Sequence, residues 1–417
     1  MAGFTARLGD RFEGVADGLR ARSSTPGRRT RTTVVLGRVL AVLLLVCFAT
    51  GLYSHVLQTP PSWLTLSPDP AWLYRVTQGT HVAAGIALVP VLLGKLWSVF
   101  PRLFAWPPIT GLGSLLERAT IALLVATVLL EVVLGLMNVA QWYAFPFSFR
   151  RVHLALAWVL IGATLLHVAV KLPVIAGFWR RSPRRAQGAE ASPAPARAPA
   201  ATWPEQSPPD PSRPTAPEET LSRRGALLAV GAAAGALTLA TVGQSFTPLG
   251  PLAVLAPRRP GIGPQGLPVN RTAAEAEVSA TDASADWRLS LVGRQRTLEL
   301  SRRQLETLPQ AEIALPIACV EGWSQQAQWG GVRLRDLLRL IDEQDGPDLT
   351  LSSMQTRGAF SVTAMPGVYA RHPDTLIALR LGGEPLHLDH GYPARVIAPG
   401  RPGVMQTKWL RRIEVDT

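Results

Sequence analysis

Five long apolar runs constrain this 417-residue chain more than any other feature. Each run has 19 to 24 residues, close to the ~20 that an α-helix needs to span a bilayer. Nearly half of the chain, 47%, is hydrophobic. The pattern therefore predicts a membrane protein with five spanning helices, at residues 39–57, 80–100, 119–140, 152–175 and 225–246.

The net charge of +13 lies mainly beside these runs. Residues 1–38 carry eight Arg and three acidic residues, and residues 171–224 carry nine basic and five acidic residues. The region from residue 247 is almost balanced, with 19 basic and 18 acidic residues. Because basic flanks remain in the cytoplasm, the N-terminus (1–32) is predicted to be cytoplasmic and residues 251–417 extracytoplasmic, in a multi-pass protein of a bacterial cell membrane. Charge placed in this way indicates membrane lipid as the partner and not nucleic acid.

Four of the seven histidines lie in or at the ends of the first four runs. Ionisable groups inside a membrane are costly, so each of them is a functional hypothesis. His153 and His167 are 14 positions apart, as are His81 and Lys95. Because 14 residues make almost four helical turns, each pair shares one helix face at two depths. The fourth histidine, His55, ends its run and is predicted to be an interfacial polar residue.

This arrangement resembles the membrane-embedded b-type cytochromes, in which facing histidines of a four-helix bundle bind haem. For residues 33–180 the resemblance implies an all-α transmembrane bundle in which His81 and His153 bind one haem b near the outer face. At the inner position His167 would face Lys95, so a second haem remains open. His167 is either an inner ligand or a buried hydrogen-bonded residue.

Glu131 is a carboxylate well inside the third run. It could relay protons at a quinone site or bond a neighbouring helix, and the sequence leaves both readings open.

Beyond residue 251 the pattern changes to short elements. Ser301 and Gln304 form a capping box that predicts a short helix, and Gly382-Gly383 predicts a hairpin turn. A second helix is predicted over 332–341. Strands are predicted at 287–292, 297–300, 312–320, 349–353, 360–364 and 375–381. These elements predict an α+β domain of about 150 residues, which is large enough for its own core.

Cys319 is the only cysteine outside an apolar run, and it opens the sequence Cys319-Val320-Glu321-Gly322-Trp323. Further on come His390-Gly-Tyr-Pro-Ala-Arg395 and Gln406-Thr-Lys-Trp409. Together these motifs make residues 268–415 similar to the molybdopterin domain of the sulfite oxidase family. Because the sequence stops at Thr417, just after the last motif, it looks closer to the bacterial methionine sulfoxide reductase branch of that family. Taken alone, Cys319 would be a buried structural thiol.

The resemblance implies a Mo-molybdopterin cofactor, with Cys319 as the catalytic molybdenum ligand, a role that suits a soft thiolate. Arg395 matches the arginine that pairs with the cofactor phosphate, and His390 stands where the bacterial reductases have an amide. The implied cofactor contacts are Asn270, Ser353, His390, Arg395, Gln406, Thr407 and Lys408.

Two features between the membrane bundle and this domain predict how it is delivered. Residues 182–220 include ten prolines, which predicts a Pro/Ala-rich cytoplasmic linker over 181–221. Ser222-Arg223-Arg224 then precedes a Gly/Ala-rich run and resembles a twin-arginine export signal, so residues 222–250 are predicted to combine this motif with the fifth helix. Two ordinary flanking charges are the alternative. A domain loaded with cofactor in the cytoplasm would cross the membrane folded, which favours a client of the twin-arginine translocase.

The sequence thus predicts a membrane-bound molybdopterin-dependent oxidoreductase. Its haem b would pass electrons between quinone or quinol and an external site that reduces a small S-oxide-like substrate. Two alternatives remain at this point: a sulfite-type oxidase that runs in the opposite direction, or a non-catalytic electron-transfer membrane protein.

Overall fold

The structure is a computed structural model that describes residues 30–61, 63–101, 111–180, 222–242, 245 and 247–416, together with Gly14 and Gly18. The predicted linker 181–221 and almost all of the predicted N-terminal segment 1–32 lie outside the described residues.

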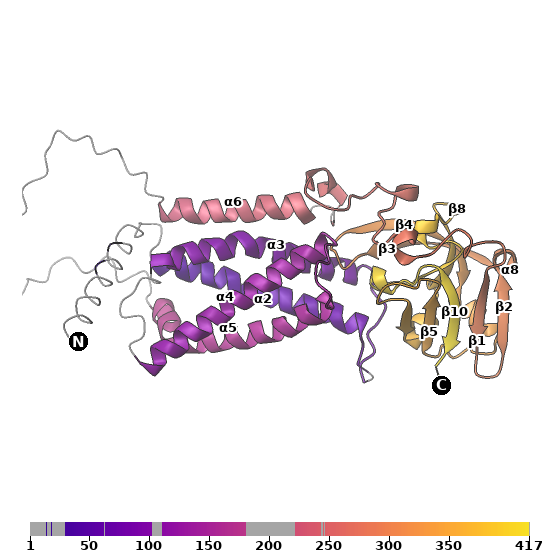
Figure 1. Cartoon of the computed structure of the whole chain (residues 1–417), viewed down its shortest axis with the longest axis horizontal. Helices are drawn as coiled ribbons and strands as arrows, with labels where there is room; N and C mark the ends of the chain where they lie inside the picture. Colours follow the sequence, from indigo (N-terminus) through magenta and orange to yellow (C-terminus); the bar gives the residue numbers. More distant parts are fainter. Residues whose placement is uncertain are drawn as a thin grey trace, which may run out of the picture. The chain divides into compact units, whose positions relative to one another are not determined.

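Among the described residues, five helices are long and apolar enough to cross a membrane (Figure 1). They are α2 (Thr30–Gln58), α3 (Leu73–Val99), α4 (Leu112–Val139), α5 (Phe149–Arg180) and α6 (Arg223–Val242). The helix α3 begins at Leu73 and not at residue 80, because its first two turns contain polar residues that an apolar pattern omits. One of them, Thr77, bonds the carbonyl of Leu73 in its own helix. His81 therefore lies about two turns inside α3 and not at its start.

The chain divides into two compact units. The first comprises residues 1–38, 93–129 and 156–230, and the second comprises residues 39–92, 130–155 and 231–417.

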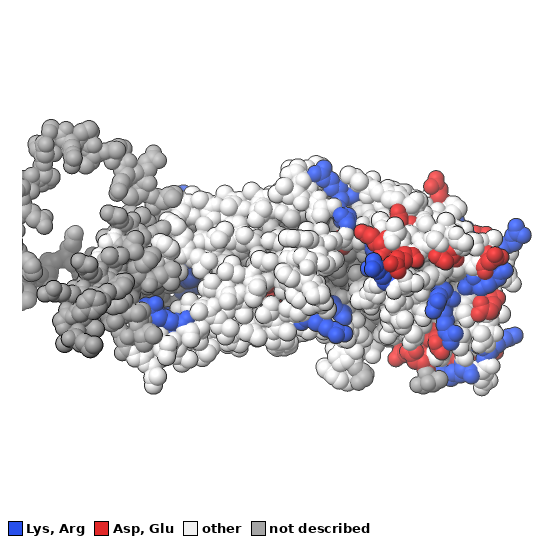
Figure 2. All heavy atoms as spheres, viewed as in Figure 1, with Lys and Arg blue, Asp and Glu red and all other residues white. Residues whose placement is uncertain are grey.

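In the first unit, polar side chains join parts of the helices. Lys95 Nζ donates to the carbonyl of Thr33 at 2.7 Å, and the hydroxyl of Thr33 donates to Ser98 at 3.1 Å. Lys171 forms an ion pair with Glu117. The helices also carry many exposed apolar side chains, and the face of the helices seen in Figure 2 is almost free of charge. Such a surface is compatible with a lipid environment.

The second unit contains two five-stranded sheets. The first sheet has the order β2-β1-β10-β5-β6, in which only β1 and β10 are parallel. The second has the order β3-β4-β7-β8, and β9 also pairs with β7. The strands are β1 (Arg288–Val292), β2 (Thr297–Ser301), β3 (Gln310–Ala318), β4 (Ser324–Arg333), β5 (Leu349–Ser353), β6 (Val362–Met365), β7 (Leu376–Leu381), β8 (Glu384–Pro385), β9 (Arg395–Ile397) and β10 (Leu410–Val415).

The strand β7 of the second sheet is buried on both faces, and its successive side chains point to opposite sides. In β7, Ile377 and Leu379 belong to the core shared with the first sheet. Leu376 and Ala378 belong to another core, which contains Cys319 and Trp323. The candidate site is therefore on the side of this sheet that faces away from the first sheet.

Several predicted elements need correction. The helix predicted over 332–341 is α9 (Leu334–Arg339), and Val332 belongs to β4. The strands β4, β8, β9 and β10 were not predicted, and Gly330-Gly331 lies inside β4. A Cβ at Gly331 would collide with the backbone of Ile377 and Ala378, so glycine permits two strands to approach closely.

The capping box and the glycine hairpin were predicted correctly. Ser301 and Gln304 cap α8 (Arg302–Thr307) reciprocally, and Gly382-Gly383 joins β7 to β8. Further short helices are α7 (Ala273–Ala276) and α10 (Gly367–Ala370), and short 3-10 helices are η5 (Thr247–Leu252), η6 (Pro264–Gly266), η7 (Leu388–His390) and η8 (Gly403–Met405).

Candidate functional site

Cys319 lies in the tight connection between β3 and β4. Its amide donates to the carbonyl of Trp323 at 2.9 Å, and the amide of Gly322 donates to the carbonyl of Cys319 at 3.1 Å. Gly322 has a φ of +94°, which favours glycine at the position that the motif supplies. We call residues 319–323 the cysteine loop.

The thiol of Cys319 is buried, with 1% of the residue exposed. Burial, followed by the nearby charge of Glu321, raises the pKa of this thiol well above its usual value. A bound metal cation reverses such a shift, because a coordinating thiol is deprotonated outright.

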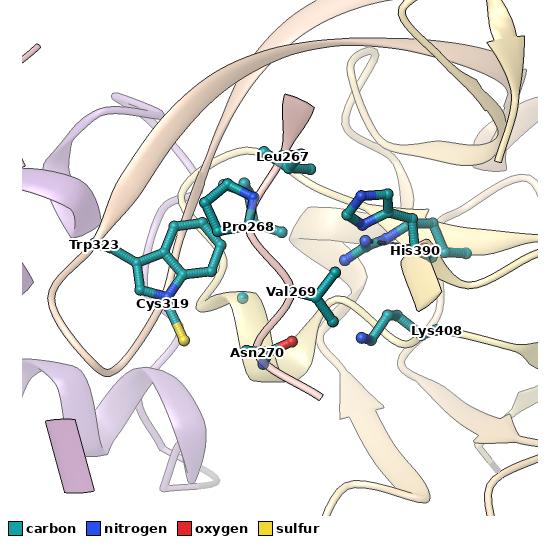
Figure 3. Close-up of a pocket in the computed structure, with 11 residues that line it drawn as sticks. Leu267, Pro268, Val269, Asn270, Cys319, Trp323, His390 and Lys408 are labelled. Atoms are coloured by element: carbon teal, nitrogen blue, oxygen red, sulfur yellow. Dashed lines mark hydrogen bonds between the residues drawn. The ribbon is translucent and has the colours of Figure 1, made fainter. Parts of the chain in front are cut away.

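A small cavity brings Cys319 together with four of the predicted cofactor contacts, namely Asn270, His390, Arg395 and Lys408. Figure 3 shows Cys319 and Trp323 on one side of the segment 267–270, and His390 and Lys408 on the other. The structure therefore gathers on one cavity residues that are up to 138 positions apart in the sequence, from Asn270 to Lys408.

Two cations at this cavity, the buried Arg395 and the partly buried Lys408, have no acidic partner among the ion pairs of the described residues. Arg395 Nη1 donates to the carbonyl of His390 at 3.0 Å, but its Nε is buried without a hydrogen-bond partner. Lys408 Nζ donates to the carbonyls of Arg271 and Asp389, at 2.5 and 3.0 Å. Burial, and then the charge of Arg395, lowers the pKa of Lys408 to about 7. Buried charge without a counter-ion is costly, so the cavity suits an anion such as a phosphate group.

These observations fit the donor set that a molybdopterin cofactor requires. A soft sulfur ligand and unpaired cations that could hold a phosphate lie on one cavity. The arrangement differs from an ordinary zinc or calcium site, since no group of three or more His, Cys, Asp or Glu residues gathers anywhere in the described chain.

His390 is positioned as a neutral imidazole. Its Nε2 lies 2.7 Å from the carbonyl of Pro264 and donates to it. Burial, together with the charges of Arg395 and Lys408, lowers the pKa of His390 to about 4. The ring therefore adds no positive charge to the two cations beside it.

Three of the predicted contacts do not line the cavity. The hydroxyl of Ser353 donates to the carbonyl of Lys408 at 2.7 Å, and Thr407 bonds Thr363 at 2.8 Å. Gln406 Nε2 donates to the carbonyl of Arg401 at 3.0 Å. These side chains support the backbone that carries Lys408, and their role as cofactor contacts stays a prediction.

Glu321 and Gln141 were missed as site residues. Trp323 Nε1 donates to one oxygen of Glu321 at 3.0 Å, and Gln141 Nε2 donates to the other. Burial raises the pKa of Glu321, while both hydrogen bonds favour its charged form. The only sequence signal was the place of Glu321 inside the cysteine loop, because Gln141 lies 180 positions away.

Two histidines face each other within the same unit. The ring centroids of His81 on α3 and His153 on α5 are 6.2 Å apart, with the ring planes at 79°. An iron that bound one nitrogen of each ring at about 2 Å would hold the two centroids about 6 Å apart. The spacing therefore fits two axial ligands of one haem.

The Nδ1 atoms of His81 and His153 both have polar neighbours. His81 Nδ1 donates to the carbonyl of Cys47 at 2.9 Å, which leaves Nε2 with the lone pair that a metal needs. His153 Nδ1 lies 2.5 Å from a carboxylate oxygen of Glu131. A Cβ at Gly51 would come within 2.8 Å of the His81 ring, so glycine makes room for this imidazole.

The remaining membrane histidines are placed differently. His167 lies in the first unit, and its Nδ1 is buried without a hydrogen-bond partner. Lys95, predicted to face it, donates to the carbonyl of Thr33. The Nδ1 of His55 is buried near the end of α2, also without a partner. None of these contacts tests a second haem, which stays a prediction.

Comparison with known proteins identifies relatives of part of the chain. Residues 275–417 match the family model described as an oxidoreductase molybdopterin binding domain. Mitochondrial sulfite oxidase of Mus musculus is 28% identical over 159 residues, which cover 31% of this chain and 29% of the mouse protein. YedZ1, a subunit assigned to a protein-methionine-sulfoxide reductase of Azospira oryzae, is 30% identical over 153 residues, which cover 36% of this chain and 56% of YedZ1.

Among solved structures, the sulfane dehydrogenase SoxCD from Paracoccus pantotrophus is 24% identical, with a TM-score of 0.29 over 31% of this chain and 38% of that chain. A likeness at this score carries no argument about the fold. The chain thus spans less than a third of mouse sulfite oxidase and just over half of YedZ1.

Proposed function

We propose that the chain, whose residues 275–417 form a molybdopterin-binding oxidoreductase domain and which is similar in part to sulfite oxidase and YedZ1, is a membrane-bound enzyme that reduces an S-oxide-like substrate with electrons from quinol. Haem b, bound by His81 and His153, would carry these electrons. The observation that carries the proposal is the presence, in one compact unit, of both the cysteine loop with its anion cavity and a histidine pair at haem spacing.

The residues divide the work. Arg395 and Lys408 would hold the cofactor phosphate by charge-assisted hydrogen bonds, and Cys319 would supply the sulfur ligand. Neutral His390 and the side chain of Asn270 would contact the pterin. When bound, the molybdenum cofactor supplies oxygen-atom transfer chemistry. Burial of Cys319 and Trp323 keeps water away from the sulfur.

The reaction balances with quinol as the reductant. Conversion of an S-oxide to a sulfide consumes two electrons and two protons and releases water, and oxidation of a quinol to a quinone provides both. The basic flanks of the apolar runs support a cytoplasmic N-terminus and an extracytoplasmic site in a bacterial membrane. Export by the twin-arginine route, with the arginine pair at the start of α6, belongs to the same proposal.

The direct test supplies membranes that contain the enzyme with a reduced quinone analogue and a panel of S-oxides. We expect quinol to be oxidised in equal amount to the sulfide that forms. If sulfite instead reduces the quinone and no S-oxide is consumed, the enzyme runs as an oxidase and the proposed direction is wrong.

The two cations at the cavity predict an effect on cofactor retention. A Lys408→Met variant loses the charge without losing the aliphatic stem, and we expect about 10- to 100-fold weaker retention of the cofactor, as for loss of a charged hydrogen bond. Molybdenum and pterin content of the purified protein measures this. The exposed Arg411 gives the control, since Arg411→Met should retain cofactor as the wild type does. Equal loss in both variants would contradict the role of Lys408.

The contact between Glu131 and His153 predicts an effect on haem potential. The negative charge of Glu131 stabilises the oxidised, more positive iron, so Glu131→Gln should raise the midpoint potential by on the order of 60 mV, a tenfold change for one electron. A redox titration of the haem absorbance measures the shift. Glu117→Gln, on the same helix but paired with Lys171, should leave the potential unchanged. A lowered potential in Glu131→Gln would contradict this reading.

A further inference from the structure

The cysteine loop contacts the helix that carries His81. Gln78 of α3 is buried, and its Nε2 donates to the carbonyl of Val320 at 2.6 Å. Val320 directly follows Cys319, and Gln78 precedes His81 by three residues, less than one helical turn. All of these residues belong to the same compact unit. One hydrogen bond therefore joins the predicted molybdenum ligand to the turn of α3 that holds the predicted haem ligand.

Packing around Gly322 strengthens this contact. A Cβ at Gly322 would come within 2.8 Å of the Val82 side chain, so the loop lies directly on the residue that follows His81. The hydroxyl of Ser245 donates to the carbonyl of Gly322. Gln78 of α3 and Ser245 of the segment after α6 thus donate to two carbonyls of the cysteine loop, those of Val320 and Gly322.

A second connection fixes the other side of the loop. Gln141 follows α4, and its amide donates to Glu321 and to the carbonyl of Asn270, the latter at 2.6 Å. Arg258 in turn donates to the side-chain oxygen of Gln141. Because Asn270 lines the cavity, the segment after α4 is bonded to the cysteine loop and to one residue of the cavity wall.

We propose that the contact between Gln78 and Val320 is the electron-transfer junction between the haem helix and the molybdenum ligand, with Gln78 as its positioning residue. The inference rests on the proposed function and specifies how its two halves are joined. The bonded route runs from His81 along one turn of α3 to the amide of Gln78, across 2.6 Å to the carbonyl of Val320, and along the backbone to Cys319. In the proposed function, each electron that crosses this contact would leave the reduced haem and reach the molybdenum centre. Two such electrons and two protons would convert one S-oxide to sulfide and water.

Gln78→Leu tests the junction because leucine has a similar size and no donor. Haem is first reduced in the full-length enzyme, S-oxide is then added, and the rate of haem oxidation is followed by its absorbance. We expect this rate to fall about 10-fold or more, as for a displacement of about 1 Å between reacting partners. A reduced viologen dye delivers electrons to molybdenum without haem, so turnover driven by this dye should stay within about 2-fold of the wild type. The molybdenum content and the haem spectrum should also match those of the wild type.

Matched variants separate the junction from general damage. The hydroxyl of Thr77 bonds only carbonyls of its own helix, so Thr77→Val should leave haem oxidation at the wild-type rate. Ser245→Ala removes the contact to Gly322 and should slow haem oxidation in the same assay, which keeps the test available if Gln78→Leu fails to fold. Without cofactor, backbone amides of the cysteine loop should exchange hydrogen faster in Gln78→Leu than in Thr77→Val.

Three results would overturn the inference. Haem oxidation at the wild-type rate in Gln78→Leu, despite faster exchange in the loop, would show that electrons bypass the contact. An equal loss in the viologen assay would make Gln78 a residue that only shapes the molybdenum site. A wild-type enzyme whose haem is not oxidised by any S-oxide would remove the proposed function, and this junction with it.

Discussion

A Cys319→Ser variant is expected to lose molybdenum-dependent turnover by more than about 100-fold, because loss of residues that merely support a metal ligand already costs 10- to 100-fold. The hydroxyl of serine is a harder and less easily ionised ligand than a thiol, and it suits a soft metal poorly. Serine also nearly preserves the size of the side chain, so the packing against Trp323 should survive. Turnover with a viologen donor, together with molybdenum content, measures the effect independently of haem.

The other cysteine provides the control. Cys47 lies on α2, and its thiol donates weakly to the carbonyl of His81 at 3.6 Å. Cys47→Ser should therefore keep both molybdenum and viologen-driven turnover. Full turnover in Cys319→Ser, in protein matured by a host that makes the cofactor, would show that this sulfur is not the ligand.

Local sequence motifs were sufficient to predict the class of the C-terminal domain. Cys319 with Gly322 and Trp323, followed by Arg395 and Lys408, indicated a molybdopterin oxidoreductase, and the family match at residues 275–417 confirms that class. Such motifs can be recognised in the sequence because each one is a short continuous run that contains several of the predicted cofactor contacts. The five apolar helices were also predicted, since length and hydropathy alone define them.

Contacts between distant segments could not be predicted in the same way. Gln78 and Val320 are 242 positions apart, and neither residue type is unusual for its place in the sequence. The strand β4 was missed because it contains several glutamines and the pair Gly330-Gly331, and its strand pairing comes from β3 and β7 on either side. In both cases the physical cause lies in the tertiary partner and not in local propensity.

The histidines of the apolar helices were predicted in part, since their spacing could be recognised but their neighbours could not. Their 14-residue spacing predicted one face of a helix at two depths, and His81 and His153 do lie side by side. What the spacing could not reveal is that Glu131 contacts His153 and that Gly51 makes room for His81. These neighbours come from helices other than those that carry the histidines, so a pattern within one helix contains no sign of them.

His81→Ala and His153→Ala are each expected to abolish the absorbance of a low-spin b-type haem, because in the proposed function both rings bind one iron. Loss of either ligand should weaken haem retention by more than about 100-fold, beyond the effect of a supporting residue. The measurement is the reduced-minus-oxidised spectrum of purified membranes, with haem extracted and counted per chain. His55→Ala is the control, since His55 lies at the end of α2, and it should keep the full spectrum.

His167→Ala completes the set, because it tests the inner position alone. If only one haem is bound, the variant should retain the wild-type haem content, whereas loss of half of the haem would identify His167 as a ligand of a second iron. Viologen-driven turnover should persist in all of these variants, since it reaches the molybdenum site without haem, while quinol-driven turnover should disappear in His81→Ala and His153→Ala. A full low-spin spectrum in His81→Ala would contradict the proposal that His81 and His153 bind one haem. The 6.2 Å between the centroids of the two rings would then not reflect a shared iron.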